Sequence, residues 1–207
     1  MRTCVLSQDE AERAVEPFRN TLASSILGAV EDWEAVLGES PTRTGGLSNF
    51  TFTRFVHDRT VHRLQTAQAA GECPGLRMKK VRGLWAAVID DQMMLKLKKL
   101  DSRLRSRNIQ TGQTLAFDNQ IPLEGFSPRP LTNATSGYVL GKSTRQIERA
   151  VVVCWDGDDQ HWAIDLLGNA GSADEVVTLP AAPAPEPTRR RTKIVAKPTA
   201  VPSDSDG

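Results

Sequence analysis

Residues 84–100 read LWAAVIDDQMMLKLKKL, and this stretch decides the fold class. It opens with a continuous apolar run, which is typical of a central strand covered on both faces. Asp90 and Asp91 then predict a tight turn. Beyond the turn, apolar and basic residues alternate, so that Leu95 and Lys96 face opposite sides of the next strand. The stretch therefore predicts two neighbouring strands of a sheet.

Helical spacing dominates residues 1–40. Ser7 followed by Glu10 is a capping-box pattern, and apolar residues then recur at helical intervals until Gly38, which predicts the end of the helix. Pro17 predicts a kink, or the start of a second part of the helix. Because the opposite face is acidic, we interpret residues 1–40 as an N-terminal acidic amphipathic helix region.

The remaining elements follow from periodicity and turn signals. Residues 41–49 have a loop composition, and the next segment fits a helix from about Asn49 that ends before Gly71, although its opening alternates like a strand. Further strands are predicted at 136–141, 147–155 and 160–167, the last two joined by a hairpin at Asp156-Gly157-Asp158-Asp159.

Together these elements predict an α+β fold, with N-terminal helices packed on a mainly antiparallel sheet of about five strands. The α+β domain would span residues 41–171. Within it, residues 101–135 predict a long irregular connection, and such loops often carry function when ordered. Residues 172–207 are rich in Pro and Ala and predict a disordered C-terminal tail, which contains a basic TRRRTK patch at 188–193.

Charge is unevenly distributed along the chain. The formal net charge is only +1, but residues 1–40 are acidic and residues 77–107 are strongly basic. Cys4, Cys73 and Cys154 are far apart and lack metal-type spacing, which argues against a disulfide framework or a zinc site. With no signal-peptide pattern and no membrane-spanning apolar run, we expect a reduced, cytoplasmic protein without a cofactor.

A basic track leaves the second strand and is followed by amide and hydroxyl side chains. Cationic groups bind phosphate or carboxylate, and amides and hydroxyls add directional hydrogen bonds. We therefore predict a binding surface for a protein partner or a nucleic acid. The alternative is internal: the track docks the acidic N-terminal helix, or its lysine face is simply solvated. The candidate binding residues are Lys96, Lys98, Lys99, Arg103, Arg105, Arg107, Asn108, Thr111 and Gln113.

No catalytic signature or metal site accompanies the track. Cys154 and His161 would face each other if the hairpin closes, as a thiol–imidazole pair. Asp90 or Asp91 with Lys96 or Lys98 resembles the carboxylate/lysine arrangement of metal-dependent nucleases, but the second carboxylate that would share the metal is missing. A nucleic-acid-processing enzyme of nuclease-like fold, or its inactive descendant, is therefore the alternative to binding.

Several segments resemble a group of uncharacterised bacterial and prophage proteins. They are Val56-His57-Asp58, IDDQMMLKLKKLD, RSRNIQTGQ, Gly137-Tyr138 and QHWAIDLL, within residues 50–167. These relatives are associated with genes for helix-turn-helix/ImmA-type metallopeptidase partners. The resemblance implies a setting of mobile elements or toxin–antitoxin-like pairs and no particular activity. The prediction is a non-enzymatic binding or regulatory partner in such a system.

Overall fold

The N-terminal helices begin and break where the sequence predicts. In the computed structural model, which describes residues 5–39, 41, 46–106, 111–141 and 146–168, Ser7 and Glu10 form the capping box. The Ser7 backbone N–H donates to Glu10 Oε2 at 2.9 Å. Pro17 lies in a short 3-10 turn that separates the first two helices. The helical segments are α1 (Gln8–Val15), η1 (Glu16–Phe18), α2 (Arg19–Glu39), α4 (Asn49–Ala69) and α5 (Gly112–Asp118).

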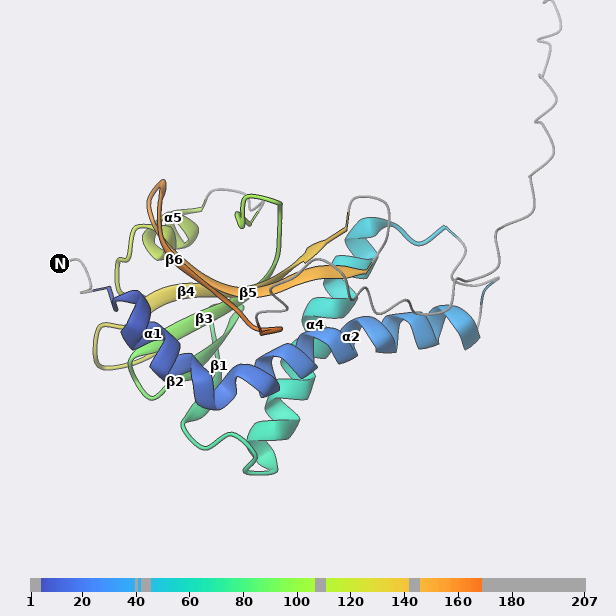
Figure 1. Ribbon diagram of the computed structural model, residues 1–207, viewed down its shortest axis with the longest axis horizontal. Helices are drawn as coiled ribbons and strands as arrows, with labels where there is room; N and C mark the ends of the chain where they lie inside the picture. The colour runs from blue at the N-terminus through green and yellow to red at the C-terminus, as the bar shows by residue number, and fades with distance from the viewer. Residues whose placement is uncertain (1–4, 40, 42–45, 107–110, 142–145, 169–207) are drawn as a thin grey trace, which may run out of the picture. The chain divides into compact units, whose positions relative to one another are not determined.

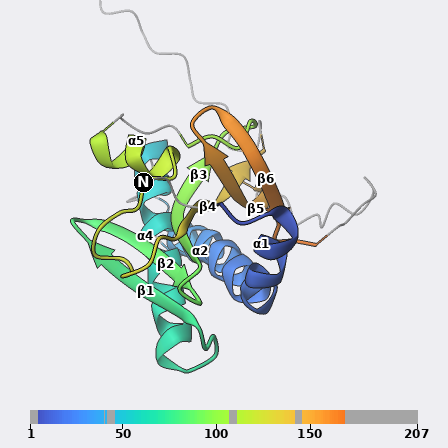
Figure 2. The ribbon, with the colours of Figure 1, turned by 90° about the vertical axis from the view of Figure 1, so that its left-hand side faces the viewer.

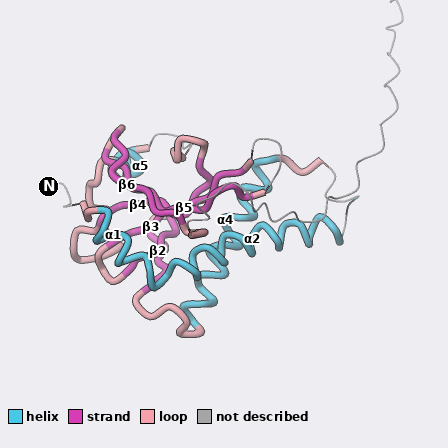
Figure 3. The backbone as a smooth tube through the Cα atoms, viewed as in Figure 1, coloured by secondary structure: helices cyan, strands magenta, loops and turns pink. Residues whose placement is uncertain are grey.

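The sheet has six strands in sequence order. All neighbouring strands are antiparallel except β3 and β4, which are parallel and connected through α5. The α+β class is confirmed, and Figure 1 and Figure 3 show the helices and the twisted sheet. The strands are β1 (Leu76–Val81), β2 (Leu84–Ile89), β3 (Met93–Leu100), β4 (Thr132–Leu140), β5 (Ile147–Asp156) and β6 (Asp159–Asp165).

The turn between β2 and β3 sets the antiparallel pairing of these two strands. Asp90 and Asp91 both have positive φ angles, 46° and 53°. The Gln92 backbone N–H donates to the Ile89 carbonyl at 2.9 Å. Two consecutive left-handed residues give the turn whose twist matches an antiparallel pair, and Asp tolerates that conformation better than most residues.

Two features of the architecture differ from the sequence-based expectation. The sheet gains β1, whose residues LRMKKV alternate only weakly because the strand lies at the edge and exposes Arg77 and Lys80. Residues 101–135, expected to be irregular throughout, contain α5, and β4 already begins at Thr132. Polar residues open β4, so their burial is not visible in hydrophobic periodicity.

The main core lies between the sheet and helices α1, α2 and α4 (Figure 2). The Trp33 ring on α2 meets Phe52 and Phe55 of α4 edge-on, with centroid distances of 5.5 and 5.2 Å. Strand residues such as Leu95 supply the other side of this core. Burying each such side chain contributes about 1.5–3 kcal/mol. The N-terminal helices therefore share one core with the sheet, and residues 1–171 form one compact unit.

The opposite face of the sheet is covered more sparsely. Phe117 of α5 and Phe126 pack there on Met94 of β3.

The segment before α1 is bound to β4 and to the edge strand β6. The Leu6 backbone N–H donates to Thr132 Oγ1 at 3.0 Å, and the Leu6 carbonyl accepts from Trp162 Nε1 at 2.9 Å. No described helix combines the length and the apolar character needed to cross a bilayer.

The predictions made for the end of the chain lie outside the described residues. They are the disordered tail at 172–207 and the TRRRTK patch within it.

Candidate binding site

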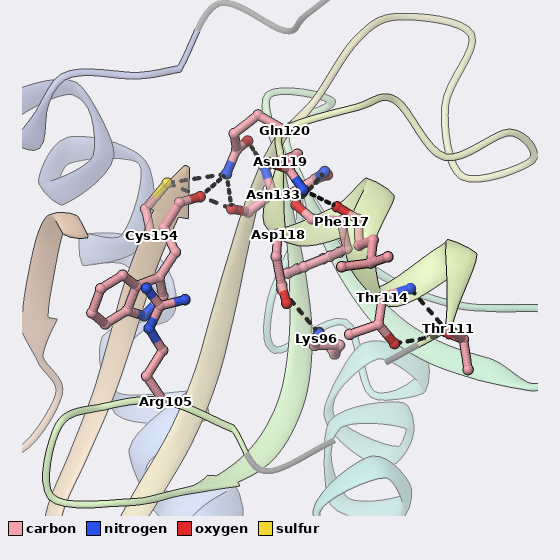
Figure 4. A network of polar contacts seen from close by, with 12 residues as sticks. Lys96, Arg105, Thr111, Thr114, Phe117, Asp118, Asn119, Gln120, Asn133 and Cys154 are labelled. Atoms are coloured by element: carbon pink, nitrogen blue, oxygen red, sulfur yellow. Dashed lines mark hydrogen bonds and ion pairs between the residues drawn. The ribbon is translucent and has the colours of Figure 1, made fainter. Parts of the chain in front are cut away.

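Lys96, the first residue of the predicted basic track, is an internal residue. It is 4% exposed, and its Nζ lies 4.1 Å from the centre of the Phe117 ring and 3.6 Å from Asp118 Oδ1. Both partners belong to α5, as Figure 4 shows. Burial lowers the pKa of Lys96, and Asp118 opposes this effect. Lys96 thus anchors α5 on the sheet, and its side chain is not accessible to a partner molecule.

The Arg105 side chain also makes its contacts within the protein. Its guanidinium stacks on the Trp155 ring at 3.6 Å, and Nη1 donates to the Gly157 carbonyl at 2.8 Å. A weaker contact of 3.4 Å joins it to the exposed carboxylate of Asp158. Arg105 therefore holds the 101–105 turn against the β5–β6 hairpin (Figure 4).

The distal residues of the track are dispersed. Arg103 is exposed. Thr111 is the N-cap of α5, where its hydroxyl accepts from the Thr114 backbone N–H at 3.2 Å, and Gln113 lies half-buried on the same helix. Arg107 and Asn108 lie outside the described residues.

The acidic helix does not neutralise the basic track. Asp32 of α2 instead binds two arginines of α4, accepting from Arg59 Nε at 2.8 Å and from Arg63 Nη2 at 2.9 Å. The hydrogen bond from Arg63 is the main cause that lowers the pKa of Asp32. Among the residues that the structure describes, no ion pair joins residues 5–39 to residues 96–105.

Lys98 and Lys99 lie where the edge of β3 is unpaired. The β2–β3 ladder ends at the pair Ala86–Lys96. Beyond it Lys98 and Lys99 are half-buried and line a pocket together with residues of α4. Within the described part of the chain, neither Lys98 nor Lys99 has a carboxylate partner. Burial lowers the pKa of Lys98, and the nearby charge of Arg54 lowers it further.

Two side chains of α4 complete this basic edge. Arg54 Nε lies 3.1 Å from Asp58, and both side chains are largely exposed, so the pair contributes little. His57 is half-buried and hydrogen-bonded to the Leu97 backbone. Burial lowers its pKa, Asp58 raises it, and Lys98 and Arg54 lower it. His57 is therefore neutral at pH 7, and the cations of this edge are Lys98, Lys99 and Arg54.

A pocket of about 180 Å³ lies beside this edge, between α2, α4, β3 and β4. Its lining includes Ser136 and Tyr138 of β4, which are 1% and 4% exposed. Neither hydroxyl has a hydrogen bond of normal geometry. Thr53 is close enough to Tyr138 to favour ionisation slightly, but burial dominates and raises the pKa of Tyr138. Sequence reasoning missed this pocket, because its residues come from four separate elements.

A buried amide network lies where β4 and β5 separate. Gln120 Nε2 donates to the carbonyls of Asn133 and Trp155, both at 2.7 Å. Gln120 Oε1 accepts from the Asn133 backbone N–H at 2.8 Å. The side chain thus replaces a missing stretch of β-ladder (Figure 4). Gln120 therefore has a structural role, and no local sequence pattern predicts that role.

Cys154 and His161 do not form the thiol–imidazole pair that the sequence left open. Cys154 is fully buried and lies opposite Trp162 in the β5–β6 ladder. Its Sγ contacts Gln120 Nε2 at 3.4 Å, while His161 is exposed. Burial raises the pKa of the Cys154 thiol to about 12. A thiol that stays protonated is a poor nucleophile.

The protonated state of Cys154 predicts a specific loss of stability in alkali. Above pH 9 the unfolded chain releases the thiol proton, whereas the folded protein retains it, so stability falls as the pH rises. Between pH 8 and 10 we expect the free energy of unfolding to fall by about 1 kcal/mol more for the wild type than for Cys154→Ala. Urea denaturation measures both, and the two proteins should respond alike between pH 6 and 8. Parallel curves up to pH 10 would show that the thiol ionises equally in both states.

The arrangement that a metal-dependent nuclease requires is not found in the described part of the chain. Asp90 and Asp91 lie in the β2–β3 turn, and Asp91 is paired with Arg77. The pocket that contains Lys98 has no carboxylate in its lining. No group of three or more His, Cys, Asp or Glu side chains among the described residues has the geometry of a metal site.

Comparison with known proteins gives no family assignment. No family model, curated protein or solved structure matches the chain.

Proposed function

We propose that this protein is a non-enzymatic binding or regulatory partner, of the kind found in mobile-element or antitoxin-like systems, which contacts an acidic segment of another protein. The contact surface is the β3 edge, made by Lys98, Lys99 and Arg54 with Phe50 beside them. The main support is that Lys98 and Lys99 carry charges with no carboxylate partner in the described chain. Phe50 is 79% exposed at the same place, and aromatic residues and arginine are enriched at protein interfaces.

A protein partner is favoured over nucleic acid by the way the fold divides the basic track. Binding a strand of nucleic acid requires cations placed along successive phosphates. Here Lys96 is buried against α5, and Arg105 is stacked on Trp155. What remains is a short patch beside the exposed Phe50 ring, made of the exposed Arg54 and the half-buried Lys98 and Lys99. The genomic setting itself rests only on the sequence resemblance.

The test uses charge reversal on the accessible patch. Lys98→Glu/Lys99→Glu should weaken binding of a purified partner at least tenfold, because a favourable electrostatic contact becomes a repulsive one. The partner is isolated from the native host with the full chain as bait, and its affinity is then measured by calorimetry at two salt concentrations. Lys98→Gln/Lys99→Gln provides a milder change should reversal disturb the fold, which circular dichroism checks.

A matched control carries the same charge change elsewhere. Lys80→Glu/Arg82→Glu alters the exposed β1–β2 hairpin and should leave the affinity within twofold. Fluorescence anisotropy with single-stranded and duplex oligonucleotides runs in parallel. Nucleic-acid binding that depends on Lys98 and Lys99, with no protein partner retained, would replace a protein by nucleic acid as the ligand. Equal losses in both double variants would contradict the assigned surface.

A further inference from the structure

The pocket beside the β3 edge combines three features that together indicate which class of ligand it would bind. It has about 180 Å³ of free volume, which exceeds the engineered 150 Å³ cavity that holds benzene. Ile26 and Leu97 form apolar parts of its wall, with Phe50 also in the lining. The pocket therefore has room for a small body with an apolar surface, in addition to a polar group.

Buried hydroxyl groups without partners supply the second feature. Ala134 and Tyr138 of β4 both belong to the core on the helix side of the sheet, so Ser136, between them in alternation, faces the same side. The Ser136 and Tyr138 hydroxyls are both buried, and among the described residues neither has a hydrogen bond of normal geometry, although Thr53 lies beside Tyr138. A buried hydroxyl left unpaired costs about 1–3 kcal/mol. Each therefore has an unused hydrogen to donate to an acceptor in the pocket.

The charge of the lining supplies the third feature. Lys98, Lys99 and Arg54 all line the pocket, and no carboxylate of the described residues does. Arg54 has only an exposed pair with Asp58. His57, also in the lining, has a pKa lowered chiefly by burial, so it is neutral at pH 7 and adds no charge of its own. The electrostatic environment favours one negative group that accepts hydrogen bonds.

We infer that this pocket binds a small organic carboxylate. Its apolar part would pack against Ile26 and Leu97. Its carboxylate would accept hydrogen bonds from the Ser136 and Tyr138 hydroxyls and from the lysines of the β3 edge. An inorganic anion alone would leave the apolar wall in contact with water. The inference goes beyond the proposed protein contact, since it assigns a small-molecule site. That site contains all four residues of the contact surface and adds Ile26, Leu97, Ser136 and Tyr138. A bound carboxylate would neutralise part of the patch that faces the partner.

Benzoate is a suitable probe because its ring and carboxylate match the volume and the charge of the pocket. In an NMR titration of the full chain, benzoate should shift the backbone amide signals of Ser136, Gly137 and Tyr138 and saturate. Benzamide, which has the same shape without the charge, should bind at least tenfold more weakly. Absence of saturable shifts with benzoate, or equal affinity for benzamide, would overturn the inference. Phenyl phosphate binding more than tenfold tighter than benzoate would overturn the carboxylate class.

Variants separate this pocket from the partner surface. Ser136→Ala and Tyr138→Phe remove hydroxyls that have no partner, so both proteins should remain folded. Each should weaken benzoate at least fivefold while leaving the affinity for a protein partner unchanged, because neither changes the surface charge. Lys98→Gln/Lys99→Gln should weaken benzoate at least tenfold, and Lys80→Gln should have no effect. Unchanged benzoate affinity in both hydroxyl variants would place the ligand elsewhere and leave the partner surface unaffected.

Discussion

Gln120→Ala is expected to lower the free energy of unfolding by about 3 kcal/mol. Gln120 is 1% exposed and is the partner of three backbone groups, the N–H and carbonyl of Asn133 and the carbonyl of Trp155. Alanine removes the bonds to the Asn133 N–H and the Trp155 carbonyl, and it leaves the Asn133 carbonyl only the weak contact from Cys154 Sγ at 3.5 Å. Because each unsatisfied buried group costs about 1–3 kcal/mol, partial entry of water still leaves a large loss. Urea denaturation at pH 7 measures the change.

A second substitution at the same position tests the cause. Gln120→Glu keeps the shape of the side chain but places a carboxylate oxygen against the Asn133 and Trp155 carbonyls, and it should be at least as destabilising as alanine at pH 7. The control is Gln160→Ala, since Gln160 lies exposed on β6 and should change stability by less than about 0.5 kcal/mol. A loss for Gln120→Ala as small as that of the control would show that the network contributes nothing.

Gly137→Ala is the other substitution with a large expected effect, a loss of about 3 kcal/mol or failure to fold. Gly137 lies opposite Lys98 in the parallel β3–β4 ladder. A Cβ atom at this position would collide with the Lys98 carbonyl oxygen and lie 2.8 Å from Leu100 Cγ. The backbone of a paired strand cannot move away without breaking the ladder, so the strands must separate. Thermal unfolding and the NMR spectrum report the change.

A glycine in open space provides the control. A Cβ atom added at Gly38, near the end of α2, would have no atom of the surrounding described residues within 4 Å. Gly38→Ala should leave stability unchanged or raise it by up to about 1 kcal/mol, since alanine favours helix. If both glycine variants had the same stability, close approach of β3 and β4 at Gly137 would not be the reason for glycine there.

Features encoded by neighbouring residues were predicted from the sequence. The capping box at Ser7, the break at Pro17, the helix from Asn49 and the turn at Asp90-Asp91 all depend on side chains within a few positions of the feature. Both the α+β class and the mainly antiparallel sheet follow from these signals. The parallel pairing of β3 with β4 was not anticipated, because it depends on how α5 crosses the sheet.

The candidate binding site could be predicted only in part from the sequence. Alternation correctly indicates that Lys96 and Leu97 face opposite sides of β3. It does not reveal which side is covered, and α5, which begins at Gly112, buries the side of Lys96. Ser136 and Tyr138 were not singled out, since an unpaired hydroxyl is recognisable only when its surroundings are known.

The single parallel ladder has a consequence for how the chain folds. β1–β3 and β4–β6 each join strands that follow one another closely along the chain, so each trio assembles from local contacts. Joining the trios requires closing the long excursion from Leu100 to Thr132, and such closure is the slow step when distant segments must meet. We therefore expect pairing of β3 with β4 to limit the folding rate, and both Gly137 and the pocket lie at this pair of strands.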